Sequence, residues 1–263
     1  MRRASLLLAL ALLALPAPAP AAPTAQGTVI PWSLLDCFFA YGQVIVPGSQ
    51  VQPYMPEGFR PAMIGVPGLP PVLTSVGIEI DVCRAGEGLN GLVSPMIYTN
   101  LWVGAIAPED LAGEPGAYFV AWDFLTPDAD RRALFQDAGL PARDGSIAVQ
   151  ETQLADMRTA FAATWTLEGL GGFGMTAVGA PANTEAIGGG HVVSFTPRAD
   201  GQLSAWRFDW DPTDAHQGAG VVTVPEGSWL AAMLGGTTHV GRVVFGAWSY
   251  TNGSIDLLVE RSP

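Results

Sequence analysis

Glycine and proline divide this chain into short segments, and this division constrains its fold more than any other feature. The 263 residues include 32 glycines and 22 prolines, which break regular structure. The segments between them either alternate apolar and polar residues or are continuously apolar. They are rich in valine, isoleucine, threonine and aromatic residues, as β-strands are. The predicted strands are 34–46, 72–83, 96–107, 117–126, 145–152, 158–168, 173–179, 191–196, 203–210, 219–224, 240–250 and 254–260.

Three segments predict short helices. They are 49–54, 128–138 and 228–234. Ser228 is a suitable N-cap for the last of these, and Gly235 a suitable end. About eleven strands with so few helices indicate an antiparallel barrel, closed or nearly closed, or a sandwich.

The chain is expected to form one domain. The segment most typical of a linker between domains is 180–190, which contains Ala-Pro-Ala-Asn and three consecutive glycines. Composition does not change across it, and the sequence shows no internal repeat. A β domain of about 240 residues is ordinary in size.

The N-terminus predicts export. Arg2 and Arg3 precede an apolar run of about eleven residues, which has the length of a signal-peptide core and is too short to span a bilayer. The best cleavage site follows Ala21, so we expect a signal peptide at 1–21 and a mature domain at 22–263. The alternative is an uncleaved anchor. No later segment predicts a membrane span.

Charge limits the partners. Removing Arg2 and Arg3 from the 12 basic residues leaves 10 against 24 acidic residues, a net charge of −14. Nucleic acids and anionic membrane surfaces would be repelled. The expected partner is a small molecule.

Two cysteines, Cys37 and Cys83, form an even pair in a chain predicted to be exported, which favours a disulfide between them. Both lie on predicted strands, so the bond requires those strands to be neighbours. Two buried free thiols are the alternative.

Aromatic residues gather on particular strand faces, because side chains alternate along a strand. One face carries Trp206, Phe208 and Trp210; another carries Tyr118, Val120, Trp122 and Phe124; a third carries Tyr98, Asn100 and Trp102. These faces either fill a core or line a ligand cavity, which is typically aromatic with a few polar groups. Asn100 and Glu79 are the polar candidates.

Glu79 lies on a strand with two distinct faces. Gly77, Glu79, Asp81 and Cys83 share one face, and four branched apolar residues share the other. If the apolar face is the core, Glu79 is solvated. If the strand lines a cavity, Glu79 points into it, and burial would raise its pKa.

Motifs for cofactors and metals are weak. The glycine-rich run at 169–174 has dinucleotide-type spacing but no helix after it, so it predicts a β-turn. His191, His216 and His239 are far apart and lack zinc spacing. A calcium loop at 209–214 would lack the glycine and distal glutamate of an EF-hand. We expect neither a cofactor nor a metal.

Several stretches, in chain order, resemble the acetoacetate decarboxylase-like superfamily. Residues 51–59 resemble its short helix and following turn, and 72–83 resembles the next strand, where a cavity glutamate sits. Residues 98–107 resemble the strand after that, and 224–229 with 240–250 resemble a helix and last strand. The resemblance spans about two-thirds of the mature chain. It implies a many-stranded antiparallel barrel around an internal cavity, with two or three short helices.

The chain departs from this family at the lysines. Its decarboxylases carry adjacent lysines after a proline, one of which forms an imine with a β-keto acid. The matching segment, 139–143, has Ala142 and Arg143 at those positions. All 12 basic residues are arginines, which excludes lysine-dependent decarboxylation. Arg143 is either an anion-binding group, because arginine stays cationic when buried, or a surface residue.

Two functions remain open. In the first, the barrel binds a small, partly apolar molecule without imine chemistry, and the molecule is anionic if Arg143 contacts it. The predicted ligand contacts are Glu79, Tyr98, Asn100, Trp102 and Arg143. In the alternative, a secreted lyase or hydrolase acts on a keto acid or related molecule, with Glu79 as acid or base and Arg143 holding a carboxylate.

Overall fold

The computed structural model describes residues 29–65, 71–87, 96–113, 116–122, 124–125, 129–187 and 189–259. The predicted signal peptide lies outside these ranges. None of the helices among the described residues has the length and apolar character needed to cross a membrane.

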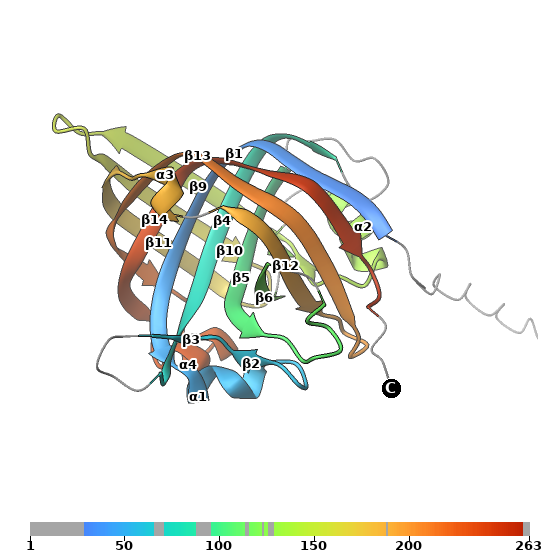
Figure 1. The fold of residues 1–263 in the computed structure, drawn as a ribbon. Coiled ribbons are helices and arrows are strands. Elements are labelled where there is room, and N and C mark those ends of the chain that lie inside the picture. Colours follow the sequence, from blue (N-terminus) through green and yellow to red (C-terminus); the bar gives the residue numbers. More distant parts are fainter. Residues whose placement is uncertain are drawn as a thin grey trace, which may run out of the picture.

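Seven strands form a closed barrel, seen in Figure 1. They are β1 (Val29–Pro47), β4 (Leu73–Glu87), β5 (Met96–Ile106), β6 (Ala117–Trp122), β12 (Gly190–Pro197), β13 (Leu203–Thr223) and β14 (Thr238–Asp256). The order around the ring is β12-β6-β5-β4-β1-β14-β13, and pairing of β12 with β13 closes it. Neighbours are antiparallel except β6 and β12, which are parallel. The expected barrel is therefore confirmed, and the sandwich is excluded.

Three more strands extend the sheet beyond the barrel. They are β11 (Gly171–Pro181), β10 (Thr159–Leu167) and β9 (Gly145–Gln153), joined in that order to the second half of β13. Strand β13 can serve both structures because it is 21 residues long. Its first half pairs with β12 and its second half with β11. The glycine-rich run at 169–174 is a turn leading into β11, as predicted.

Two predicted breaks do not occur. Residues 203–210 and 219–224 were expected to be separate strands, but they belong to one strand, β13. The polar residues between them still pair with β14, with a register shift between Pro212 and Asp214. Backbone pairing does not require apolar side chains, and a bulge accommodates proline in a strand.

The break expected between strands 240–250 and 254–260 is also absent. Strand β14 continues to Asp256 and so takes in the start of the predicted strand 254–260, whereas residues 257–259 lie beyond its end. Asn252 adopts a φ of 51° within the strand, where the register shifts between neighbouring pairs. Asparagine and glycine favour a turn here, but β14 pairs with a strand on each side. The result is a local irregularity in the strand instead of a turn.

The predicted helices are present and short. They are α1 (Gly48–Val51) with the 3₁₀ turn η1 (Gln52–Tyr54), α2 (Ala129–Asp137) and α4 (Trp229–Leu234). Ser228 caps α4 by accepting a hydrogen bond from the Ala231 amide at 3.1 Å, and Gly235 ends it at a φ of 75°. A further helix, α3 (Thr184–Ile187), lies in the predicted linker. Four two-residue strands complete the fold: β2 (Arg60–Pro61), β3 (Met63–Ile64), β7 (Phe124–Leu125) and β8 (Ala142–Arg143).

The central parts of β1 and β4 are buried on both faces, and β5 is buried on one face and half-buried on the other. One face of β4, with Val76, Ile78 and Ile80, packs in a cluster with Trp165 of β10 and Met175 of β11. The opposite face turns into the barrel, where a second cluster lies. Both faces of β4 are therefore interior, which places Glu79 inside the barrel.

Cys37 and Cys83 form a disulfide, as predicted. They lie directly opposite each other in the pairing of β1 with β4. Both are almost fully buried, at 1% and 0% exposure. The bond joins the two strands that carry one wall of the barrel interior.

Replacing both Cys37 and Cys83 by alanine should lower the free energy of unfolding by about 2–4 kcal/mol, because the link closes a loop of 46 residues in the unfolded chain. Urea denaturation followed by tryptophan fluorescence measures this loss. Addition of a reductant to the unsubstituted protein should move its midpoint in the same direction. An unchanged midpoint in the double variant would contradict the prediction.

Candidate functional site

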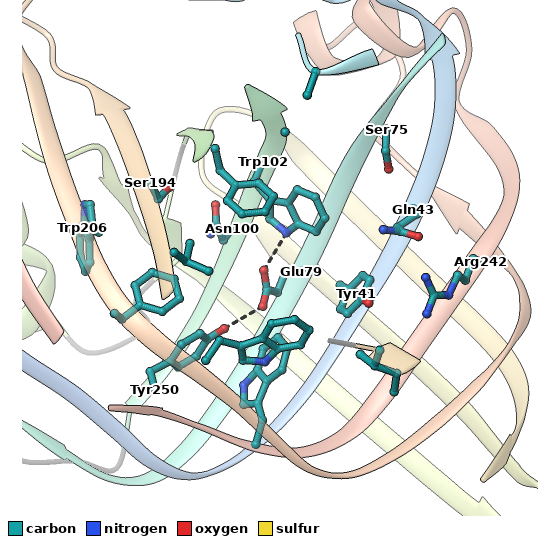
Figure 2. A pocket seen from close by; sticks show the side chains of 18 of the residues that line it. Tyr41, Gln43, Ser75, Glu79, Asn100, Trp102, Ser194, Trp206, Arg242 and Tyr250 are labelled. Atoms are coloured by element: carbon teal, nitrogen blue, oxygen red, sulfur yellow. Dashed lines mark hydrogen bonds between the residues drawn. The ribbon is translucent and has the colours of Figure 1, made fainter. Parts of the chain in front are cut away.

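The barrel encloses a cavity of about 400 Å³, shown in Figure 2. This volume is within the range of small-molecule sites. Ten aromatic residues line it: Trp32, Tyr41, Trp102, Phe119, Phe135, Trp206, Phe208, Trp210, Trp248 and Tyr250. Its polar side chains are those of Gln43, Ser75, Glu79, Asn100, Ser194 and Arg242.

Alternation along the strands explains most of this lining. The predicted aromatic face of Trp206, Phe208 and Trp210 on β13 does line the cavity. On β6 the cavity receives Phe119 instead of the predicted set that contains Tyr118 and Val120. Aromatic residues occur on both faces of β6, so alternation alone does not identify its inner face.

Glu79 is the best-held polar group of the cavity. Its side chain is 6% exposed. The Trp102 indole Nε1 donates to Oε2 at 2.7 Å, and the Tyr250 hydroxyl donates to Oε1 at 2.8 Å. These donors come from β5 and β14, on opposite sides of β4, so the carboxyl group is fixed in position from both sides (Figure 2).

A glycine makes the Trp102 contact possible. Gly77 pairs with Trp102 across β4 and β5. A Cβ atom at Gly77 would lie 2.1 Å from the indole ring of Trp102. The missing side chain lets the indole lie over β4 and reach Glu79, two residues along the same face.

A second carboxylate lies behind Glu79. Asp81 is fully buried, and its Oδ1 accepts hydrogen bonds from Trp248 Nε1 at 3.0 Å and from the Tyr250 hydroxyl at 3.3 Å. Tyr250 has one hydroxyl proton and can donate to only one carboxylate at a time. When Glu79 is protonated, it can donate a hydrogen bond to the Tyr250 hydroxyl while that hydroxyl donates to Asp81. Both hydrogen bonds of the Tyr250 hydroxyl can then form at the same time.

Burial raises the pKa of Glu79 to about 7, and the hydrogen bonds from Tyr250 and Trp102 oppose this rise. Loss of water around a carboxylate disfavours its charged form. Near neutral pH the cavity therefore holds Glu79 in both neutral and ionised forms.

Of the remaining predicted ligand contacts, one lines the cavity, one does not, and one has a side chain that the structure does not describe. Asn100 lines the cavity opposite Glu79, and its Oδ1 is buried without a hydrogen-bond partner among the described residues. Tyr98 of β5 pairs with Asp81 of β4, but the side chain of Tyr98 lies outside what the structure describes. Arg143 does not line the cavity. It lies on β8, where its guanidinium donates to the Glu168 carbonyl at 3.0 Å.

Sequence reasoning missed the cavity residues of the last strand. Arg242, Trp248 and Tyr250 line the cavity from β14, and their even numbers place them on one face. Tyr41 lines it from β1, and burial raises the pKa of its hydroxyl to about 12, opposed by nearby Arg242 and assisted by Glu79. Alternation in 240–250 could have suggested this face. Within the described ranges, no cluster of three or more histidine, cysteine, aspartate or glutamate side chains could hold a metal ion.

Gly77→Ala should displace the Trp102 indole and remove its hydrogen bond to Glu79, at a cost of about 1–3 kcal/mol from overpacking. Gly104→Ala is the matched control, because a Cβ atom at this cavity glycine would meet only Ala62 at 3.6 Å. Thermal denaturation should show a clear loss for Gly77→Ala and little change for the control. Equal effects of the two substitutions would contradict this account.

The free energy of unfolding should fall as pH rises from about 4.5 to about 7. Over this range the unfolded chain loses the Glu79 proton and the folded protein keeps it, so folding becomes less favourable. Glu79→Gln removes this contribution, worth at most about 3.5 kcal/mol at ~1.4 kcal/mol per pKa unit. Urea denaturation of both proteins from pH 4 to 8 measures the difference. Parallel stability curves would show that the Glu79 pKa is not raised.

Comparisons with known proteins rest on structure. No family model and no curated protein sequence matches this chain. An acetoacetate decarboxylase-like enzyme from Sphingomonas wittichii RW1 matches with a TM-score of 0.58 and 10% identity, over 90% of this chain and 93% of that chain. Acetoacetate decarboxylase from Legionella pneumophila matches with a TM-score of 0.56 and 11% identity, over 88% of both chains.

A third match is the enduracididine biosynthesis enzyme MppR with HEPES buffer bound. Its TM-score is 0.52 at 14% identity, over 86% of this chain and 85% of that chain. At such low identities the likeness concerns the fold alone. The barrel, its sheet extension and its enclosed cavity thus give this chain the acetoacetate decarboxylase-like fold, as the resemblance in its sequence predicted.

Proposed function

We propose that the protein is exported and that its barrel cavity binds a small, partly apolar, anionic molecule without covalent chemistry. The observation that carries this proposal is an aromatic cavity of about 400 Å³ with polar side-chain atoms that have no hydrogen-bond partner in the described part of the chain. These atoms include Asn100 Oδ1 and Ser75 Oγ. Buried polar groups are almost always hydrogen-bonded in native proteins, so a ligand or water is expected to complete them.

The carboxyl pair suits such a ligand. Glu79 and Asp81 are both buried, and two charges there would repel an incoming anion. A protonated Glu79 removes one of these charges and leaves a neutral group beside the cavity. Below its raised pKa, Glu79 is compatible with an anionic ligand.

Non-covalent binding is favoured by the composition of the chain. Imine chemistry requires a free amine, and this sequence has no lysine side chain to supply one. The structural neighbour MppR has been solved in complex with pyruvate, which is a small anion. This supports a small anionic ligand for the present cavity, bound through hydrogen bonds and charge.

Export is favoured by two independent features. The N-terminus has the pattern of a signal peptide ending at Ala21. The Cys37–Cys83 disulfide is of the kind that persists in oxidising compartments.

Native mass spectrometry of the protein from its own host tests both parts. We expect an intact mass corresponding to residues 22–263 with the disulfide formed. We also expect a bound molecule of defined mass that mild denaturation releases. A full-length mass would contradict export, and an empty, compact protein would contradict a stably bound ligand.

Affinity for an anionic probe such as 1-naphthaleneacetate should fall about tenfold between pH 6 and pH 8, because ionised Glu79 adds a negative charge to the cavity. Tyr250 of β14 contacts both Glu79 and Asp81, Tyr41 of β1 lies near Glu79, and Arg242 lies near Tyr41. Glu79→Gln keeps the shape and stays neutral, so its affinity should not change over this range. Isothermal titration calorimetry measures both proteins.

A slope retained in Glu79→Gln would assign the pH dependence to another group. The acid/base enzyme remains the alternative and predicts a different outcome for the same variant. In that case Glu79→Gln would bind normally but lose turnover of keto acids or related molecules.

A further inference from the structure

Arg242 is a cation on the cavity wall with no acidic partner in the part of the chain that the structure describes. It lies on β14 directly opposite Gln43 of β1 and lines the cavity. Its Nη2 donates to the Gln217 side chain at 2.6 Å, and its Nε is buried without a hydrogen-bond partner. Among the described residues, no carboxylate lies within 4.0 Å of its guanidinium.

This isolation is unusual for so acidic a chain. The sequence has 24 acidic and 12 basic residues, so a carboxylate is available for every arginine. Arg242 is half-buried and its Nε is fully buried, and a charge that is partly removed from water without a partner is costly. The guanidinium of Arg242 is therefore suited to an anion that the protein itself does not supply.

Further donors surround the guanidinium. Gln43 and Ser75 line the same side of the cavity, and the Ser75 Oγ is buried without a partner. The Tyr41 hydroxyl also lines it and stays protonated at neutral pH, since its pKa is raised to about 12. Figure 2 shows these three side chains together with Arg242 along one side of the cavity. All four can donate hydrogen bonds to one anion.

The rest of the lining determines the body of the ligand. Ten aromatic side chains face a volume of about 400 Å³. That volume holds roughly a dozen or more non-hydrogen atoms, far more than a short-chain acid has. Aromatic walls favour a flat apolar group that can stack against them or meet their ring edges.

We propose that Arg242, with Gln43, Ser75 and Tyr41, forms a carboxylate-binding subsite, and that the ligand is an aromatic carboxylic acid. This inference rests on the proposed function and specifies its ligand class. The planar guanidinium matches a carboxylate geometrically. Glu79 lies on the far side of β1, on β4, and two residues further along the wall, where it meets the other end of the ligand.

The test compares an acid with its uncharged counterpart. The probes are 1-naphthaleneacetate and 1-naphthaleneacetamide, measured by isothermal titration calorimetry at pH 6, where Glu79 is protonated. The unsubstituted protein should bind the acid about ten- to a hundredfold more tightly than the amide, as expected for charge-assisted hydrogen bonds. Arg242→Gln should abolish this preference, so that the ratio of the two affinities falls to about one.

Two further variants sharpen the comparison. Arg158→Gln is the matched control, because Arg158 is exposed and paired with Asp156 at the surface; it should retain the full preference. Arg242→Lys keeps the charge but loses the planar fork, so it should retain only part of the preference. Circular dichroism and thermal denaturation establish that each variant is folded. If Arg242→Gln fails to fold, Arg242→Lys carries the test.

The outcomes separate the subsite from the cavity. Equal binding of acid and amide by the unsubstituted protein overturns the carboxylate subsite while the proposed binding function stands. A preference that survives in Arg242→Gln, or an undiminished preference in Arg242→Lys, also overturns it. Failure of the unsubstituted protein to bind either probe overturns both proposals for aromatic ligands of this size.

Discussion

The structure depends on the burial of both faces of β1 and β4. An ordinary antiparallel strand hides one face and leaves the other in water. Here the extension β9–β11 covers the apolar outer face of these strands, with Trp165 and Met175 packed against Ile78 and Ile80. The polar inner face therefore lies within the barrel, and Glu79 and Asp81 become interior carboxyl groups.

The chemistry of the cavity follows from this burial. Removing water from Glu79 raises its pKa, and the two donors that hold it only partly compensate. The single hydroxyl of Tyr250 lies within hydrogen-bond distance of both Glu79 and Asp81. The protonation state of Glu79 therefore decides which carboxyl group receives the hydroxyl proton. Gly77 contributes by having no side chain, since the indole that reaches Glu79 occupies the space above it.

The cavity has two distinct polar regions on an aromatic wall. One is the Glu79 carboxyl, held by Trp102 and Tyr250. The other is Arg242, with donors around it and no carboxylate of the described chain beside it. They lie on β4 and β14, which are separated by one strand, β1, that pairs with both. A neutral acid, and a cation with no carboxylate partner among the described residues, are the features on which the proposed binding of a partly apolar anion rests.

Local pattern in the sequence was sufficient for most of the strands, for the short helices with the Ser228 cap, and for the class of the fold. Strand alternation and helix capping are local properties, so residues close in sequence carry them. The pairing of Cys37 with Cys83 followed from there being only two cysteines in the chain. The continuity of β13 and β14 through Pro212 and Asn252 did not follow, because partner strands on both sides outweigh local turn propensity.

The site required the tertiary structure. Alternation placed Glu79 on one face of its strand, but which face is interior depends on the β9–β11 extension, more than 60 residues away in sequence. Arg143 matched a family position in sequence, yet the fold turns it toward Glu168 and brings Arg242 to the cavity instead. The sequence by itself determined the strands, the cysteine pair and the absence of a reactive amine. Only the tertiary structure decided which side chains share the cavity, because that depends on contacts between strands far apart along the chain.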